Sequence, residues 1–222
     1  MNNNTDNLLK KWRSEKIQKC KRFPEYLYYF SSLSNIENII KFGILSKNQI
    51  LKKNIQSESF ANLVVQKYRK NIKCEISNKE IKYLHDLVPL YLNPKTPTLY
   101  SRKYIQEDVF FCMINSSELL TDTNINFAFT DGNATNLTTK FYRNLEDLNK
   151  LNWEIIMSER WNDKPDGKRI RNSEFLIYPK IELKYIKFIS CQRYKTIDKL
   201  EPYIKGKNIK LNVNKSLFFD IL

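Results

Sequence analysis

The chain has 222 residues, with 38 Lys and Arg against 24 Asp and Glu, which gives a formal net charge of +14 at pH 7. A hydrophobic content of 41% excludes a disordered chain, and four Gly with seven Pro exclude a collagen-like or low-complexity one. The densest apolar run, residues 109–114, has the length of a strand, whereas a membrane span needs roughly 20 apolar residues. Because the first residues also lack the apolar segment of a signal peptide, we expect a soluble, cytoplasmic protein without a membrane partner.

The cysteine and histidine content limits the possible chemistry. The four cysteines are scattered, no Cys-x-x-Cys pair occurs, and His85 is the single histidine. We therefore expect no metal site of the Cys/His kind. A Cys–His or Ser–His catalytic pair would have to use His85, for which we expect a hydrogen-bonding role within the fold. Chemistry in this chain must rest on carboxylates, arginines, hydroxyls or a bound cofactor.

The positive charge favours a polyanionic partner, because clustered Lys and Arg attract phosphate. Basic and aromatic residues alternate in three segments, at residues 67–70, 100–104 and 140–143. Single-stranded nucleic acid is held by this combination, with cations on phosphates and rings stacked on bases. A lysine-rich surface that only keeps the protein soluble is the alternative, and net charge does not choose between the two.

In chain order, the pattern first predicts a basic amphipathic helix over residues 1–23 and a strand over 27–30. A capping pattern at Ser34 opens a helix that ends at Gly43. Residues 59–70 are predicted to be helical, and the polar residues 71–83 to be a mobile loop. A strand over 87–92, interrupted by Pro89, then leads into a turn over 93–97.

Short strands and helices alternate irregularly in the second half of the chain, which predicts an α+β fold and not a doubly wound sheet. No internal repeat is evident, and we expect an N-terminal basic helix or extension over residues 1–25 and a single domain over 26–222. The predicted strands are 109–114, 127–130, 174–178, 185–191 and 209–213; the predicted helices are 144–150, 152–161 and 196–204; residues 164–168 are predicted to be a loop.

Three segments contain residues suited to chemistry. Residues 130–134 include an Asp-Gly pair, which taken alone predicts only a turn. Glu174 stands at the start of an apolar strand, directly after the basic segment 168–171. A carboxylate at the rim of a sheet can stabilise the oxocarbenium-like state of N-glycosidic cleavage while nearby cations contact a polyanion. A solvated charge run is the alternative. His85 next to Asp86 is the third segment, and the adjacent positions do not favour a catalytic couple.

The order of these segments resembles the DarT family of DNA ADP-ribosyltransferase toxins. The resemblance covers roughly residues 26–191 and rests on segments in the family's order: 28–32, 35–46, 84–100, 129–142 and 171–181. It implies an α+β, ADP-ribosyltransferase-like domain over 26–222 with a split, mostly antiparallel β core flanked by helices. It also implies NAD+ as a substrate in the cleft, without a metal.

The resemblance further implies an activity. Members transfer ADP-ribose from NAD+ to a base of single-stranded DNA, thymine or guanine, in a sequence-dependent way, and the lesion blocks replication. A macrodomain antitoxin similar to DarG removes it. Two alternatives stay open: an ADP-ribosyltransferase that acts on RNA or protein, and a non-catalytic basic–aromatic module that binds nucleic acid.

Residue by residue, the resemblance assigns catalytic roles to Glu174 and Arg69, the latter also in NAD+ handling. Tyr29 stands where the family usually has a histidine, and its hydroxyl can still donate a hydrogen bond. The resemblance implies cofactor-binding roles for Tyr28, Tyr29, Ser31, Asn35, Gly43, Leu45, Arg69, Tyr91 and Tyr100, and DNA-binding roles for Asn93, Lys95, Asn133, Lys168, Arg169 and Arg171.

Overall fold

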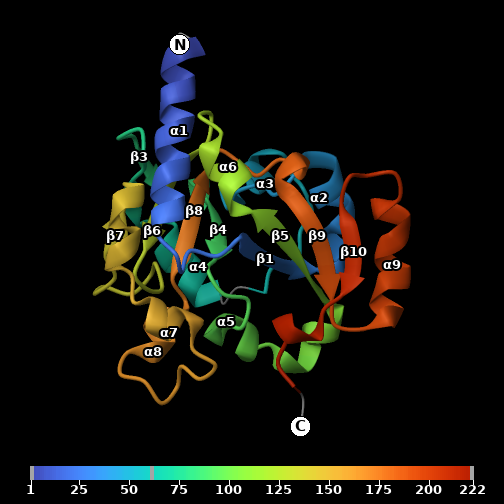
Figure 1. The fold of residues 1–222 in the computed structure, drawn as a ribbon. Helices are drawn as coiled ribbons and strands as arrows, with labels where there is room; N and C mark the ends of the chain where they lie inside the picture. Colours follow the sequence, from blue (N-terminus) through green and yellow to red (C-terminus); the bar gives the residue numbers. More distant parts are fainter. Residues whose placement is uncertain (1–2, 61–62, 221–222) are drawn as a thin grey trace.

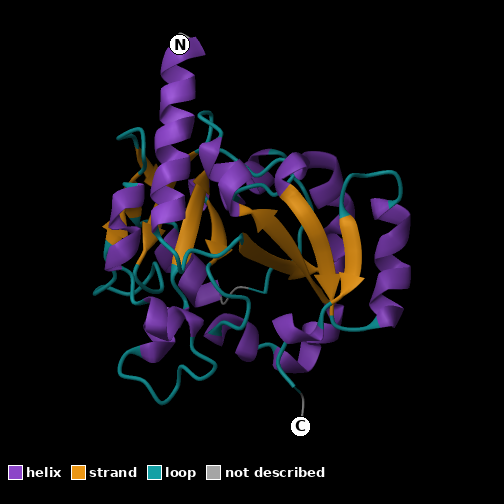
Figure 2. Ribbon diagram, in the orientation of Figure 1, coloured by secondary structure: helices purple, strands orange, loops and turns teal. Residues whose placement is uncertain are grey.

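The computed structural model describes residues 3–60 and 63–220 (Figures 1 and 2). Within them, eight strands form one sheet in the order β10-β9-β5-β1-β4-β8-β6-β7. Its neighbouring strands run antiparallel except β9 and β10, which are parallel. The strands are β1 (Tyr26–Ser32), β4 (Val88–Tyr91), β5 (Val109–Asn115), β6 (Asn126–Thr130), β7 (Phe141–Tyr142), β8 (Glu174–Tyr178), β9 (Ile186–Cys191) and β10 (Lys210–Val213), with a separate pair of β2 (Lys73–Glu75) and β3 (Ile81–Tyr83).

The sheet is split between β1 and β4, which confirms the predicted α+β fold with a split antiparallel core. These two strands share a single register pair, Tyr28 with Tyr91, whereas β1 pairs with β5 from Tyr26 to Ser32. The halves β10-β9-β5-β1 and β4-β8-β6-β7 therefore diverge beyond this pair. Pro89 lies in the diverging part of β4, where its missing N–H is tolerated.

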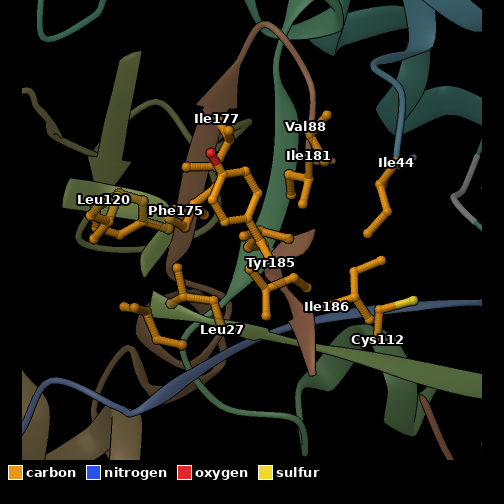
Figure 3. Close-up of a cluster of buried hydrophobic side chains, with 14 of the residues drawn as sticks. Leu27, Ile44, Val88, Cys112, Leu120, Phe175, Ile177, Ile181, Tyr185 and Ile186 are labelled. Carbon is orange, nitrogen blue, oxygen red and sulfur yellow. The ribbon is translucent and has the colours of Figure 1, made fainter. Parts of the chain in front are cut away.

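The core is apolar and continuous across both halves. In β5, the residues from Val109 to Met113 are all buried, as is typical of a strand covered on both faces. Figure 3 shows part of the largest cluster, in which Leu27, Phe175 and Ile186 come from β1, β8 and β9. Each such side chain contributes about 1.5–3 kcal/mol by leaving water. Because this core contains side chains from both halves of the sheet, it holds the two halves together on either side of the split.

The helices cover the edges and ends of the sheet. In Figure 1, α1 projects above the sheet, α9 stands at the right beside β10, and α5, α7 and α8 lie at the bottom. The helices are α1 (Asn3–Lys19), α2 (Ile36–Phe42), α3 (Lys47–Lys52), α4 (Leu63–Arg69), α5 (Pro97–Tyr100), α6 (Ser116–Thr121), α7 (Trp153–Met157), α8 (Gly167–Arg171) and α9 (Tyr194–Ile204). None of the helices described in residues 3–60 and 63–220 is long and apolar enough to cross a membrane.

Helix α1 is attached to the body of the protein by Arg13. Its guanidinium is buried and donates to the carbonyls of Leu120, Asp122 and Ile125 at 3.1, 2.9 and 3.0 Å. Burial lowers the pKa of Arg13, although the nearby Asp122 partly offsets this. The predicted N-terminal helix is confirmed over Asn3–Lys19 but ends before residue 23, and residues 1–2 of the prediction lie outside the described residues. The division into an extension over 1–25 and a domain over 26–222 stays a prediction.

The prediction of a mobile loop over residues 71–83 is wrong. Strands β2 and β3 form an antiparallel pair there, with Cys74 opposite Lys82. Cys74 and Ile76 are buried against Leu84 and Leu176, and two apolar side chains in a polar segment give too weak a signal to read from sequence. Pro89 also does not interrupt its strand, because β4 is continuous from Val88 to Tyr91.

The predicted strands over 27–30, 109–114, 127–130, 174–178, 185–191 and 209–213 are confirmed within one or two residues. The predicted helices and loop differ from the structure in three places. Helix α7 ends at Met157 instead of residue 161, α8 begins at Gly167 inside the predicted loop, and residues 145–150 form a 3-10 helix. Of the helix predicted over 59–70, residues 61–62 lie outside the described residues, and α4 begins at Leu63.

Candidate active site

Glu174 is the first residue of β8, at the split in the sheet. Its backbone N–H donates to the hydroxyl of Thr130, the last residue of β6, at 3.0 Å, which joins the start of β8 to the end of β6. Its register partner in β4 is Tyr91, so the two side chains share one face of the sheet. Only 3% of Glu174 is exposed. A buried carboxylate of this kind must be paired or hydrogen-bonded.

Arg69, at the end of α4, supplies the partner. Its Nη1 donates to Oε1 of Glu174 at 2.9 Å, and its Nη2 lies 2.9 Å from Oε2. The first contact is a hydrogen bond and the second an ion-pair contact without hydrogen-bond geometry, so the carboxylate is held mainly through Oε1. Burial opposes a charge on Arg69, but Glu174 outweighs it and raises the pKa of the guanidinium. The two predicted catalytic residues are therefore in direct contact, 105 positions apart in the sequence.

The Asp-Gly turn contributes a third group to the carboxylate. The backbone N–H of Ala134 donates to Oε1 of Glu174 at 3.2 Å. The loop that carries it is closed by Asn133, whose backbone N–H donates to the carbonyl of Arg169 at 2.9 Å and whose Oδ1 accepts from Thr135. Sequence reasoning predicted the turn but not this amide, since a backbone donor has no residue signature.

A cavity of about 170 Å³ opens between the two halves of the sheet. Tyr29 and Ser31 from β1 line one side, and Tyr91 from β4 lines the other. Arg69 forms part of its wall, whereas Glu174 lies behind Arg69 and does not line it. Leu45, from the segment before α3, completes the set of predicted cofactor-binding residues that reach this cavity.

Four other predicted cofactor-binding residues lie outside that cavity. Asn35 and Gly43 line a smaller cavity that shares Tyr29, Ser31 and Leu45 with the first. Tyr28 packs edge-on against Phe111 in the core, and Tyr100 is 45% exposed on the surface. At Gly43 the φ angle of 77° and the carbonyl oxygen of Ile181, 2.3 Å from an added Cβ, require glycine.

Residues 57–60 form a strap over the larger cavity, and two groups hold it in place. Asn35 is buried: its Nδ2 donates to the carbonyl of Glu58 at 2.8 Å, and its Oδ1 accepts from the N–H of Glu58 at 3.0 Å. The Glu58 carboxylate accepts from the hydroxyls of Ser32 and Ser34, which lower its pKa. Asn35 thus positions a wall of the cavity, and sequence analysis did not single out Glu58.

The two tyrosines that face the cavity remain neutral at ordinary pH. Burial raises the pKa of Tyr91 to about 12, and the neighbouring Glu174 adds to this effect. Burial likewise raises the pKa of Tyr29 to about 12. Both hydroxyls can therefore donate hydrogen bonds to a ligand throughout the physiological range.

His85 lines the cavity from a 3-10 helix (Leu84–Asp86). Its Nε2 lies 3.1 Å from the side-chain oxygen of Gln66, so the expected hydrogen-bonding role is confirmed. Burial, followed by the positive charges of Arg69 and Lys47, lowers the pKa of His85. The ring is thus an uncharged donor or acceptor beside Arg69.

Arg171 differs from what its predicted DNA-binding role suggests, because it is 3% exposed. Its guanidinium donates to the carbonyl of Ile156, to the carbonyls of Lys95 at 2.9 Å and Ser158 at 2.7 Å, and to Oδ1 of Asn93 at 2.7 Å. These partners are neutral, and burial lowers the pKa of Arg171 to about 10. The side chain positions the loop at 93–95 and the end of α7.

The other predicted DNA-binding residues differ in how far they are exposed. Arg169 bonds to Asp131 at 2.8 Å and to Asp166 at 2.6 Å. Burial opposes its charge, but these two carboxylates raise its pKa. Lys168 is exposed on α8, and Lys95 is partly exposed. Lys168 and Lys95 thus present charge to solvent, while Asn93 and Arg169 are engaged within the protein.

Metal-ligating side chains do not gather in the part of the chain that the structure describes: it holds no group of three or more His, Cys, Asp and Glu side chains placed to bind an ion. The site consists of a buried Arg–Glu pair, neutral hydroxyls and a cavity between diverging strands. Such a set can stabilise positive charge on a sugar carbon through the carboxylate and hold anionic groups through the guanidinium.

Comparison with solved structures defines the class of fold. Two structures of Thermus sp. 2.9 DarT superpose on this chain, one in complex with ADP-ribosylated ssDNA (TM-score 0.77, 23% identity) and one in complex with NAD+ (TM-score 0.72, 22% identity). Each covers 88% of this chain, and 97% and 98% of the Thermus chain respectively. The chain therefore has the fold of these DarT structures.

Sequence comparison shows the family. A family model described as "ssDNA thymidine ADP-ribosyltransferase, DarT" matches residues 28–219, and the chain belongs to this DarT family. A DNA ADP-ribosyl transferase of Thermus sp. (strain 2.9) is 29% identical over 163 residues, 70% of this chain and 75% of the relative. A DNA ADP-ribosyl transferase-DNA ADP-ribosyl glycohydrolase fusion protein of Thermosipho africanus (strain H17ap60334) is 26% identical over 205 residues, 89% of this chain and 50% of the relative.

Proposed function

We propose that this protein transfers ADP-ribose from NAD+ to a base of single-stranded DNA, with Glu174 and Arg69 as its catalytic residues. The observation that carries the proposal is the buried Arg69–Glu174 pair, whose arginine forms part of the cavity wall, in a member of the DarT family. NAD+ is the donor, as in the NAD+ complex of the Thermus relative. The cavity between β1 and β4 and the smaller one beside it hold the dinucleotide.

The chemistry proceeds at C1′ of the nicotinamide ribose. The bond from C1′ to the nicotinamide nitrogen breaks, and its electron pair leaves with nicotinamide. Glu174 stabilises the resulting oxocarbenium-like centre until a base nitrogen donates its electron pair to C1′. The base loses its proton to the Glu174 carboxylate or to water. Arg69 stays protonated, holds the diphosphate and disperses charge, since a guanidinium does not serve as a neutral base.

Thymine is the first acceptor to test, because the description of the matching family model names thymidine, and guanine is the alternative. A single-stranded target avoids most of the cost of unpairing the base. Recognition is sequence-dependent in this proposal, and the partly exposed Lys95 and the exposed Lys168 are two cations available to the strand.

In its cellular role the protein is a toxin that acts in the cytoplasm, where modified template strands block replication. A macrodomain antitoxin similar to DarG is the proposed partner. The Thermosipho relative supports this, because it joins a DNA ADP-ribosyl transferase to a DNA ADP-ribosyl glycohydrolase in one chain. Removal of ADP-ribose by the partner would reverse the lesion.

The test is incubation of the protein and NAD+ with a mixed set of short DNA oligonucleotides, followed by intact mass spectrometry. The expected result is a mass increase of one ADP-ribose on DNA, localised to one base by fragmentation. Glu174→Gln keeps a side chain of the same size and should abolish transfer while NAD+ and DNA still bind. Normal transfer by Glu174→Gln would remove Glu174 from the mechanism.

Matched RNA and protein substrates separate the remaining functions. Modification of RNA or protein in preference to DNA would show that the acceptor is not DNA. No nicotinamide release with any polymer would favour a non-catalytic binding module instead.

A further inference from the structure

Three aromatic rings form a surface cluster beside α5, here called the aromatic platform: Tyr100, Trp161 and Phe219. The ring of Tyr100 lies 6.1 Å from Trp161 and 5.1 Å from Phe219, with interplanar angles of 81° in both cases. Tyr100 is 45% exposed, and the other two rings are partly exposed. Three rings that come from distant parts of the chain thus meet at the surface.

Buried backbone contacts fix the platform in place. Gln106 is fully buried, and its side-chain amide donates to the carbonyl of Phe219 and accepts from the N–H of Phe219 at 3.1 Å. Gly167 lets the carbonyl of Trp161 approach so closely that an added Cβ would lie 1.9 Å from the oxygen. The hydroxyl of Thr96 caps α5, which carries Tyr100. These rings are held in defined positions.

Lysines accompany the rings. The ammonium of Lys95 lies 6.0 Å from the ring centre of Phe219, and that of Lys103 lies 5.1 Å from the ring centre of Tyr100. Lys103 is also 5.0 Å from the ring centre of Tyr104, which is 74% exposed. A flexible lysine beside an exposed ring offers a cation to a phosphate while the ring offers its face to a base.

The platform adjoins the proposed active site without being part of the cavity. Thr98 lines the cavity and donates to Oδ1 of Asn172 at 3.0 Å, two positions before Glu174. Tyr100 follows two residues later on the same helix, turned by about 200° from Thr98. Helix α5 therefore has one side toward the cavity and the opposite side on the platform. Figure 1 shows α5 at the bottom of the molecule, beside α7, α8 and the C-terminal segment.

We infer that the aromatic platform binds nucleotides that flank the target base of the single-stranded DNA. Bases stack on Tyr100, Trp161 and Phe219, and Lys95 and Lys103 contact the neighbouring phosphates. The inference rests on the proposed function and extends it, since it gives Tyr100 a role with DNA in place of the predicted role with NAD+. The net charge of +14 and the pairing of rings with lysines favour a nucleic acid strand over a protein.

The test compares wild type with Tyr100→Ala on a nested set of oligonucleotides, shortened one nucleotide at a time from each end around the modified base. Stacking is worth about 1–3 kcal/mol per base. Tyr100→Ala should therefore raise the Kd of the longer strands, measured by fluorescence anisotropy, by about 5- to 150-fold. The shortest modified strand does not reach the platform, so its Kd and the KM for NAD+ should be unchanged.

Two matched variants serve as controls. Tyr100→Phe keeps the ring and should bind DNA as wild type does. Tyr83→Ala removes another exposed aromatic ring with a lysine nearby, since Tyr83 is 42% exposed and Lys73 lies 4.8 Å from its ring centre. Tyr83 belongs to β3, which Figure 1 places at the upper left, away from α5, and its loss should not change the Kd.

A lysine variant keeps the inference testable if Tyr100→Ala does not fold. Lys103→Gln leaves every ring in place and should reduce the slope of log Kd against log salt concentration by roughly 0.7, the value for one phosphate contact on a single strand. An unchanged slope would count against the platform.

The outcomes separate this inference from the proposed function. An equal loss of affinity for all strand lengths, or a raised KM for NAD+ in Tyr100→Ala, would overturn the inference that the platform binds flanking nucleotides. If wild type transfers ADP-ribose to no oligonucleotide, the proposed function fails. The length-dependent difference in Kd between wild type and Tyr100→Ala, then measured on truncations of the tightest-bound oligonucleotide, would still decide whether the platform binds a strand.

Discussion

Arg69 and Glu174, the proposed catalytic residues, also depend on each other for stability. Their exposed fractions are 7% and 3%, so removal of either leaves the other as an uncompensated buried charge. In general this costs about 3–5 kcal/mol, whereas removal of both partners costs much less than the sum. The pair is therefore an interaction that a double-mutant cycle can measure.

We expect Arg69→Ala and Glu174→Ala each to lower the free energy of unfolding by about 3–5 kcal/mol, and the double variant to lose clearly less than the two losses added. Urea denaturation followed by circular dichroism measures all four proteins. Additive losses would mean that the two groups do not interact in solution. Glu174→Gln, which has no charge but retains the shape, provides the comparison for transfer activity.

At the residue scale, the sequence predicted the side chains but not the backbone groups. Glu174 and Arg69 could be assigned because their segments stand in the order of a known family, and the structure brings them together. Ala134 could not be predicted, because its contribution is a backbone N–H that any residue supplies. Glu58 and Gln106 were also missed. Glu58 lies in the strap and Gln106 binds the C-terminal segment, and neither of these segments has a periodic pattern in the sequence.

At the scale of elements, Arg171 links three segments. It joins the loop after β4, the end of α7 and its own helix α8 through neutral oxygen acceptors. Buried acceptors that lose their donor destabilise a protein. Arg171 and Lys168 share α8 but differ in burial, which makes them a matched pair for experiments.

We expect Arg171→Ala to lower the free energy of unfolding by roughly 2–4 kcal/mol, because several acceptors lose their donor at once. Hydrogen exchange should increase at residues 93–96 and 156–158. Lys168→Ala should change stability by less than about 0.5 kcal/mol and weaken DNA binding instead. Equal stability of the two variants would show that the contacts of Arg171 are not maintained in solution.

The elements that could be predicted are those with dense apolar patterns. Residues 109–114 and 174–178 are buried strands and read as such in the sequence. The hairpin of β2 and β3 escaped prediction, because its two buried residues, Cys74 and Ile76, stand among charged ones. Helix α8 escaped because its start at Gly167 depends on close contact with Trp161, which only the folded chain creates.

At the scale of the whole molecule, the net charge of +14 attracts the negatively charged DNA strand electrostatically. Much of this charge lies far from the site, as on α1, so it raises the rate of encounter more than it selects a sequence. The split sheet itself could not be derived from composition: it followed only from the family resemblance, because divergence of β1 from β4 depends on a single register pair.

We expect the affinity for single-stranded DNA to fall steeply with salt. If Lys95, Lys103 and Lys168 each contact one phosphate, the Kd should rise roughly 20-fold between about 50 and 200 mM salt. Fluorescence anisotropy over that range gives the slope. The KM for NAD+, which carries only two phosphates, should change far less. A Kd for DNA that does not depend on salt would mean that stacking alone holds the strand.

The position of Arg69 in front of Glu174 has a consequence for the resting enzyme. The carboxylate is engaged by Arg69 and does not line the cavity, so in the proposed mechanism a dinucleotide must draw the guanidinium toward its diphosphate before the acid faces the sugar. The work of separating that pair is subtracted from the affinity for NAD+.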